Sequence, residues 1–214
     1  ELADSEYQKV KDAINSYVDD LSNLDNPTEA QENIANAHKE LLQDPYFSDT
    51  IEGKIKNENK NSELALDETV REMVEIMSAL DDEYLKERAS DYQDIGYQVT
   101  YKLKGIKPKN LSNLDKGSII ISKELTPSDT ANMDKDAVVG FATDWGGKTS
   151  HTSIIAQTLD MPALVGMTDV STKLKGGEKA IIDGHEGLLI VNPSDEEIKK
   201  YEVLISEQKA KKER

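Results

Sequence analysis

The first half of the chain places apolar residues three and four positions apart, which is the spacing of a helix that buries one face. The pattern predicts five helices, over residues 1–22, 27–44, 48–56, 62–80 and 83–104. In the second of them, Asn26 is the expected N-cap and Pro27 the first helical residue. Because the breaks between the helices are short, residues 1–107 are predicted to form a helical bundle.

The pattern changes at Pro108. Short apolar runs, separated by turn residues, predict five strands at residues 118–122, 137–143, 163–166, 180–183 and 188–191. One helix, which starts near His151, lies between the second and third strands. Residues 108–193 are therefore expected to form a compact α/β unit, and a charged helix over 194–214 would follow it as a linker. The predicted fold class is α+β or α/β, with a helical bundle followed by a β/β/α subdomain.

Charge and composition exclude several functions. With 42 acidic and 26 basic residues and a net charge of −16, the chain is not expected to bind nucleic acid or an anionic membrane; a partner with a basic surface is favoured. The absence of cysteine excludes disulfides, thiol catalysis and zinc held by Cys, and it fits a reducing cytosol. No apolar run has the length of a membrane span. The histidines share no metal-ligand spacing, so no metal site is expected, and His38 and His185 are expected to be structural.

The stretch with the clearest chemistry is residues 146–156, with the sequence GGKTSHTSIIA. Its two glycines allow a tight turn, and Thr149 or Ser150 can cap the helix that follows. His151 would then lie in the first helical turn, beside Lys148. A helix N-terminus favours an anion and keeps an imidazole neutral, so this histidine could accept a phosphoryl group. A histidine at such a position is more often a solvated or capping residue.

A nucleotide-binding P-loop is the alternative reading of the same stretch. Residues 142–149 fit a relaxed form of that motif, in which Lys148 would contact the β- and γ-phosphates and Thr149 would hold Mg²⁺. Such a domain needs several more parallel strands and helices to cover them. Too few residues follow Thr149 to supply these elements, so the P-loop is the weaker hypothesis.

Residues 146–156 and the MPALVG run at 161–166 together resemble the phosphohistidine signature of phosphoenolpyruvate-utilising enzymes. That superfamily also includes pyruvate phosphate dikinase and phosphoenolpyruvate synthase, whose corresponding domains are the nearest alternatives. Three further stretches are similar to enzyme I of the bacterial sugar phosphotransferase system, at residues 79–91, 125–131 and 37–45. The similarity runs along nearly the whole chain in the family's order.

The resemblance implies the N-terminal part of enzyme I, with a helical subdomain and a swivelling phosphohistidine subdomain. In that family a phosphoryl group moves from phosphoenolpyruvate, bound with Mg²⁺ in a separate C-terminal domain, to a histidine that matches His151. It then passes to the carrier protein HPr, which docks on the helical subdomain. The chain is thus expected to hold no cofactor, to lack the phosphoenolpyruvate site and the family's opening strand, and to come from a cytoplasmic enzyme that dimerises through the absent domain.

The resemblance also implies roles for individual residues. His151 would be the phosphohistidine, attacking through Nε2, and Thr130 would orient its ring. Lys148, Thr149 and Ser150 would stabilise the phosphoryl oxygens together with the first-turn N–H groups. The residues expected to bind the carrier lie in the helical subdomain: Glu29, Arg88 and Asp91.

Several positions depart from the family pattern, and two of them lie at or beside the phosphohistidine signature. Lys148 stands where the family usually has arginine, which keeps the charge but loses the bidentate fork, and Gln157 stands where an arginine commonly follows. A phosphoryl group carries nearly two negative charges at neutral pH. We therefore expect slower or less favourable phosphorylation than in a typical member, or the use of a divergent carrier.

Overall fold

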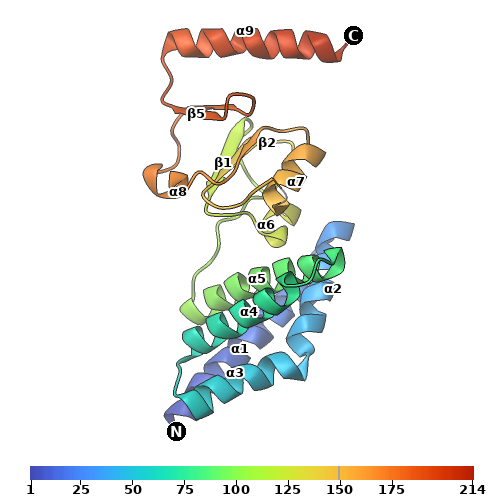
Figure 1. Ribbon diagram of the computed structural model, residues 1–214, viewed down its shortest axis with the longest axis vertical. Coiled ribbons are helices and arrows are strands. Elements are labelled where there is room, and N and C mark those ends of the chain that lie inside the picture. The colour runs from blue at the N-terminus through green and yellow to red at the C-terminus, as the bar shows by residue number, and fades with distance from the viewer. Residues whose placement is uncertain (149) are drawn as a thin grey trace. The chain divides into compact units, whose positions relative to one another are not determined.

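The computed structural model of the chain describes residues 1–148 and 150–214. They divide by packing into two compact units, one formed by Glu1–Leu111 with Thr126–Met133 and the other by Ser112–Leu125 with Asp134–Arg214 (Figure 1). The sequence predicted divisions at residues 108 and 194. The packing differs in three respects: the first boundary follows Leu111, residues 126–133 group with the helices, and the last helix groups with the strands.

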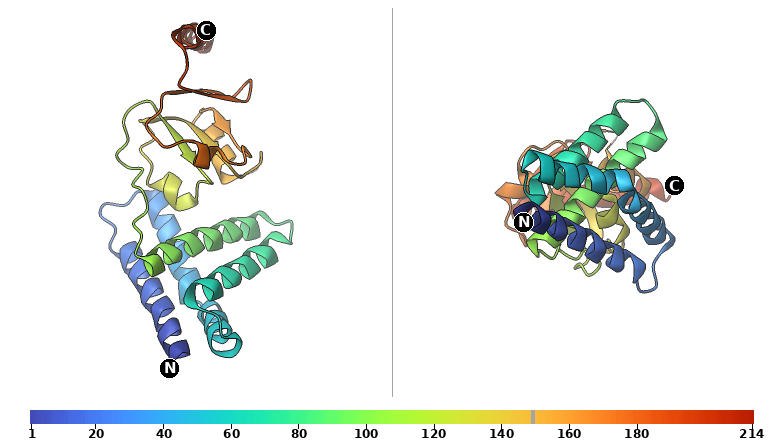
Figure 2. Two further views of the ribbon diagram at one scale, coloured as in Figure 1. Left: turned by 90° about the vertical axis from the view of Figure 1, so that its left-hand side faces the viewer. Right: turned by 90° about the horizontal axis from the view of Figure 1, so that it is seen from below.

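The helical unit contains the expected helices and one short addition. They are α1 (Leu2–Ser22), α2 (Glu29–Gln43), α3 (Pro45–Glu58), α4 (Ser62–Ser78), α5 (Glu83–Lys104) and α6 (Pro127–Ala131). Figure 2 shows α4 and α5 side by side, and α6 packs against α2 and α5. The bounds of α5 are those predicted, because Asp82 caps its start and Gly105 ends it in the left-handed conformation.

The starts of α2 and α3 differ from the prediction. Thr28, not Asn26, is the N-cap of α2, because its hydroxyl accepts from the Gln31 N–H at 3.2 Å while the Gln31 side chain accepts from the Thr28 N–H at 2.9 Å. Helix α3 begins at Pro45 rather than near residue 48, since the Asp44 carboxylate accepts from the Tyr46 N–H at 3.0 Å. For α2 the observed cap lies two residues after the expected one, and asparagine and threonine are both good N-cap residues.

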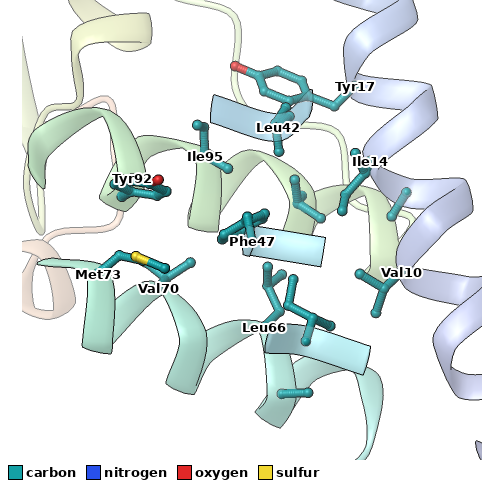
Figure 3. Close-up of a cluster of buried hydrophobic side chains, with 14 of the residues drawn as sticks. Val10, Ile14, Tyr17, Leu42, Phe47, Leu66, Val70, Met73, Tyr92 and Ile95 are labelled. Carbon is teal, nitrogen blue, oxygen red and sulfur yellow. The ribbon is translucent and has the colours of Figure 1, made fainter. Parts of the chain in front are cut away.

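One apolar core holds the first five helices together. In Figure 3 the labelled side chains point toward a shared centre near Phe47, whose side chain is 1% exposed. The Phe47 ring lies 5.8 Å from the Tyr92 ring, between centroids. Each helix contributes its apolar stripe to this core, as the sequence pattern predicted; the contributing residues include Val10, Ile14, Leu42, Ile51, Leu66 and Ile95.

The second unit combines short strands with helices. Its elements are β1 (Ser118–Ser122), β2 (Val138–Thr143), α7 (His151–Thr158), β3 (Ala163–Leu164), α8 (Val170–Lys173), β4 (Ala180–Asp183), β5 (Leu188–Val191) and α9 (Asp195–Lys212). Within the described residues, β1, β2 and β3 form a parallel sheet in that order, and β4 pairs with β5 as an antiparallel hairpin. The predicted combination of a helical region and an α/β unit is confirmed.

The parallel sheet determines where the GGKTSH stretch lies. Strand β2 is almost wholly buried, and it ends at Thr143. Helix α7 is the connection from β2 to its parallel neighbour β3, so the loop between Asp144 and Ser150 begins at the carboxyl end of the sheet. This is the end at which parallel sheets place ligand-binding loops.

Candidate functional site

The base of the loop is fixed by the carboxylate of Asp144. It accepts hydrogen bonds from the Ser171 N–H, at 2.9 Å, and from the Ser171 hydroxyl. Burial acts to raise the pKa of Asp144, but the bonds from Ser171 hold that pKa below its usual range. The backbone adds to this attachment, because Asp144 O accepts from Thr168 N at 3.0 Å. Asp144 was missed from the sequence, although a carboxylate directly after a buried strand is a usable signal.

The loop turns sharply at Gly146. Its φ of +110° lies in the region that disfavours any residue with a Cβ. A Cβ built here would lie 3.1 Å from the Ser150 hydroxyl oxygen and 3.6 Å from the Val165 Cβ. The backbone conformation therefore strongly favours glycine, and any larger residue would also have to displace Ser150.

The next residues close the turn onto α7. Gly147 O accepts from Ser150 N at 3.0 Å and from the Ser153 hydroxyl at 2.8 Å. Ser150 is the N-cap of α7, because its hydroxyl accepts from the Ser153 N–H at 3.3 Å. Of the two predicted caps, Thr149 lies outside the described residues and Ser150 has this role.

His151 is the first residue of α7 and is half-buried. The first-turn N–H groups of a helix point away from its own hydrogen-bond ladder and, with the helix dipole, create a positive potential. A histidine here lies in an environment that favours a bound anion. The position can therefore combine a nucleophilic ring nitrogen with stabilisation of a developing negative charge.

Lys148 precedes this helix and its side chain is exposed. Among the ion pairs of residues 1–148 and 150–214, none involves Lys148, so its ammonium is not neutralised by a neighbouring carboxylate. Gln157 is also exposed, in the last turn of α7. His151, Lys148 and Ser150 are thus brought together by one turn and one helix start.

The other predicted site residues belong to the helical unit. Thr130 is buried on α6, and its hydroxyl donates to the Pro127 carbonyl at 3.0 Å. Arg88 and Asp91 lie one turn apart on α5, with Nη1 and Oδ2 separated by 3.8 Å. The Arg88 guanidinium also donates to the Tyr84 hydroxyl at 3.0 and 3.1 Å. Glu29 is exposed at the start of α2.

The described residues contain no cluster of three or more His, Asp or Glu side chains that could hold a metal ion. His38 is buried and His185 is exposed in the turn between β4 and β5. No helix of the described residues is both long and apolar enough to cross a bilayer.

Comparison with known proteins decides the family. Residues 1–88 match the family model described as "PEP-utilising enzyme, N-terminal", and residues 114–187 match "PEP-utilising enzyme, mobile domain". A solution structure of an enzyme I protein, nEIt, is 37% identical, with a TM-score of 0.74 over 97% of this chain and 86% of that one. The chain belongs to the enzyme I family of phosphoenolpyruvate-utilising enzymes.

Curated members of the enzyme I family agree with this assignment. The phosphoenolpyruvate-protein phosphotransferase of Staphylococcus aureus is 38% identical over 93% of the chain and 36% of its own length. The enzyme of the same name from Geobacillus stearothermophilus is 43% identical over 78% of the chain and 29% of its own length. The chain therefore spans about a third of the length of these relatives. The N-terminal domain of the nitrogen enzyme 1, at 22% identity and a TM-score of 0.52, shares the fold.

The enzyme I assignment confirms the resemblance drawn from the sequence. The mobile-domain match contains both His151 and Thr130, whereas the N-terminal match contains Glu29 and Arg88. Thr130 thus belongs to the mobile domain by sequence, yet its helix packs with the helical unit.

Proposed function

We propose that this chain is the phosphohistidine and carrier-binding part of a phosphoenolpyruvate-protein phosphotransferase. His151 accepts a phosphoryl group that originates in phosphoenolpyruvate and passes it to HPr during sugar uptake. The observation that carries this proposal is the position of His151, which is the first residue of α7 after a turn that favours glycine, within the match to the mobile domain.

The transfer is a pair of in-line displacements. The Nε2 lone pair of His151 attacks phosphorus, a P–N bond forms, and the P–O bond to the enol oxygen of phosphoenolpyruvate breaks. In the second displacement an imidazole nitrogen of the carrier attacks phosphorus, and the P–N bond to His151 returns its electron pair to the ring. A loose phosphoryl transition state needs little covalent assistance, so positioning and charge stabilisation dominate.

The residues around His151 supply that stabilisation. The first-turn N–H groups of α7 and the exposed Lys148 ammonium face developing negative charge, and the hydroxyls of Ser150 and Thr149 can donate to phosphoryl oxygens. We assign the orientation of the imidazole to Thr130. As the family resemblance implies, we place Mg²⁺ with phosphoenolpyruvate, outside this chain.

The helical unit receives the carrier. Arg88 and Asp91 present adjacent opposite charges on α5, and Glu29 presents an exposed carboxylate on α2. The net charge of −16 would attract a carrier with a basic face and speed its encounter. We further propose that the enzyme works in the cytoplasm and dimerises through a part outside this chain.

A mass measurement tests the transfer. HPr is first phosphorylated by a separately purified enzyme I, which is removed, and is then mixed with this chain. The wild type should gain one acid-labile phosphoryl group, and His151→Ala should gain none. His185→Ala is the matched control, because His185 is an exposed histidine of the same unit, and it should be phosphorylated like the wild type. Phosphorylation of His151→Ala, or none of the wild type, would refute the proposal.

A further inference from the structure

A buried polar network lies in the helical unit and has no part in the phosphoryl transfer described above. It joins Tyr17 of α1, His38 of α2, Asp94 of α5 and Ser128 of α6. The side chains of His38 and Asp94 are both 0% exposed. In Figure 3 the Tyr17 ring lies at the edge of the apolar core, with its hydroxyl pointing away from Phe47. Polar groups buried to this degree are costly unless they are paired, so their arrangement calls for an explanation.

Asp94 is the residue that reaches α6. One of its oxygens, Oδ2, accepts from the Ser128 N–H at 2.9 Å and from the Ser128 hydroxyl at 2.7 Å. The other, Oδ1, accepts from Gln98 Nε2 at 3.3 Å. Ser128 is the second residue of α6, so its N–H is one of the donors that the helix cannot satisfy itself. Asp94 thus completes the start of α6 with a charged acceptor.

His38 supports Asp94 from the other side. Its Nδ1 lies 2.7 Å from the Tyr17 hydroxyl oxygen. Burial, and secondly the charge of Asp94, raises the pKa of Tyr17, so the hydroxyl keeps its proton. The other ring nitrogen, Nε2, faces Asp91 Oδ1 at 3.5 Å and Asp94 Oδ2 at 3.7 Å. The Tyr17 hydroxyl thus holds the His38 ring in an orientation that places Nε2 beside the buried carboxylate of Asp94.

Helix α6 needs such an anchor because it has only five residues. A helix of one turn is not stable by itself in water. In sequence, α6 lies between β1 and β2, whereas by packing it belongs to the helical unit. Directly after α6, Gln31 Nε2 donates an exposed hydrogen bond to Asn132 Oδ1 at 2.8 Å. The bonds from Ser128 to Asp94 are partly buried and have a charged acceptor, so they are the stronger of these two attachments.

We propose that Asp94, oriented by His38 and Tyr17, is a positioning residue that anchors α6, and with it Thr130, to the helical unit. Thr130 lies two residues after Ser128 on the same short helix, so its place is set by this attachment. The consequence for catalysis rests on the proposed function, in which Thr130 orients His151. Weakening the anchor should then lower the rate of phosphoryl uptake at saturating HPr, while leaving the carrier's KM unchanged.

Hydrogen exchange of the whole chain tests the anchor directly. Ser128→Ala removes the 2.7 Å bond to Asp94, and Asp94→Asn removes the charge. Ser62→Ala is the matched control, because Ser62 is also buried in the helical unit and its hydroxyl donates to Glu6 of α1, away from α6. We expect the amides of residues 126–133 to exchange about tenfold faster in the first two variants and at the wild-type rate in Ser62→Ala. Wild-type protection in Ser128→Ala would overturn the anchor.

Phosphoryl uptake from HPr then tests the catalytic consequence. The rate at saturating carrier should fall about tenfold to a hundredfold in Ser128→Ala, since a misplacement of about 1 Å can have an effect of that size. It should recover in Ser128→Thr, which keeps the hydroxyl, and stay unchanged in Ser62→Ala. A rise in KM alone, or equal losses in Ser128→Ala and Ser62→Ala, would contradict a positioning role. If the wild type takes up no phosphoryl group, the proposed function fails, and the exchange rates still decide the anchor.

Discussion

Replacing Gly146 with alanine tests whether the turn before His151 is built as described. The residue has a φ of +110°, where a Cβ is strained whatever space surrounds it. The added carbon would also lie 3.1 Å from the hydroxyl oxygen of Ser150, the N-cap of α7. The substitution therefore disturbs both the backbone and the cap of the helix that carries His151.

The two effects have known sizes. A residue held in a sparsely populated backbone region costs about 1–3 kcal/mol, and a displaced N-cap serine about 1 kcal/mol. Gly146→Ala should therefore lower the free energy of unfolding of the α/β unit by roughly 2–4 kcal/mol. With a urea dependence of about 2 kcal/mol per molar, the midpoint should fall by about 1–2 M.

Unfolding of the α/β unit can be measured by tryptophan fluorescence. The chain's one tryptophan, Trp145, lies in the α/β unit next to Gly146, so its fluorescence in urea reports on that unit. Gly147→Ala is the matched control, because Gly147 lies outside the positive-φ set and an added Cβ would meet nothing within 4 Å. We expect the control to shift the free energy by less than about 1 kcal/mol. Equal midpoints for the two variants would refute the assigned geometry of the turn.

Three further predictions concern stability, pH and charge. Hydrogen bonds from Lys9 and then Ser62 lower the pKa of Glu6 from 4.5 to about 2, so its contribution to stability is present above pH 4.5 and lost as the pH falls toward 2. Thermal unfolding, monitored by circular dichroism, should show that Glu6→Gln loses less stability than the wild type as the pH falls over this range. A pH dependence equal to that of the wild type would contradict the assignment. Phe47→Ala should lower the free energy of unfolding of the helical unit by about 3–5 kcal/mol in the same assay, and a loss below 1 kcal/mol would show that Phe47 is not central to the core. Gln157→Arg should raise the equilibrium share of phosphorylated chain about twofold to fivefold in exchange with HPr, whereas Gln157→Glu should lower it; equal shares would show that the missing cation has no effect.

The long helices could be predicted from the sequence because each repeats its apolar stripe over several turns. Helix α5 was predicted from first to last residue for this reason, with Gly105 as a clear end. Helices α6 and α8 were not predicted, since five and four residues are too few to show a period. The strands were located closely, because turn residues separate their short apolar runs, although β3 is two residues shorter than expected.

The candidate site, too, could be predicted only in part from the sequence. His151, Lys148 and Ser150 were found from one continuous motif, and the structure shows how the Gly146 turn and the Ser150 cap bring them together. The attachments of the site were not predictable, because their partners are far apart in sequence. Asp144 meets Ser171 at a separation of 27 residues, and Asp94 meets Ser128 at a separation of 34. Contacts of this kind depend on the tertiary fold and leave no periodic signal.

The location of the phosphoryl group shows directly whether His151 is the residue that reacts. After the chain is exchanged with phosphorylated HPr, fragmentation mass spectrometry under neutral or basic conditions can identify the modified residue. We expect one phosphoryl group, on His151, at the first position of α7. A phosphoryl group on any other residue, or an unmodified chain when a full-length enzyme I is phosphorylated by the same carrier, would contradict this expectation.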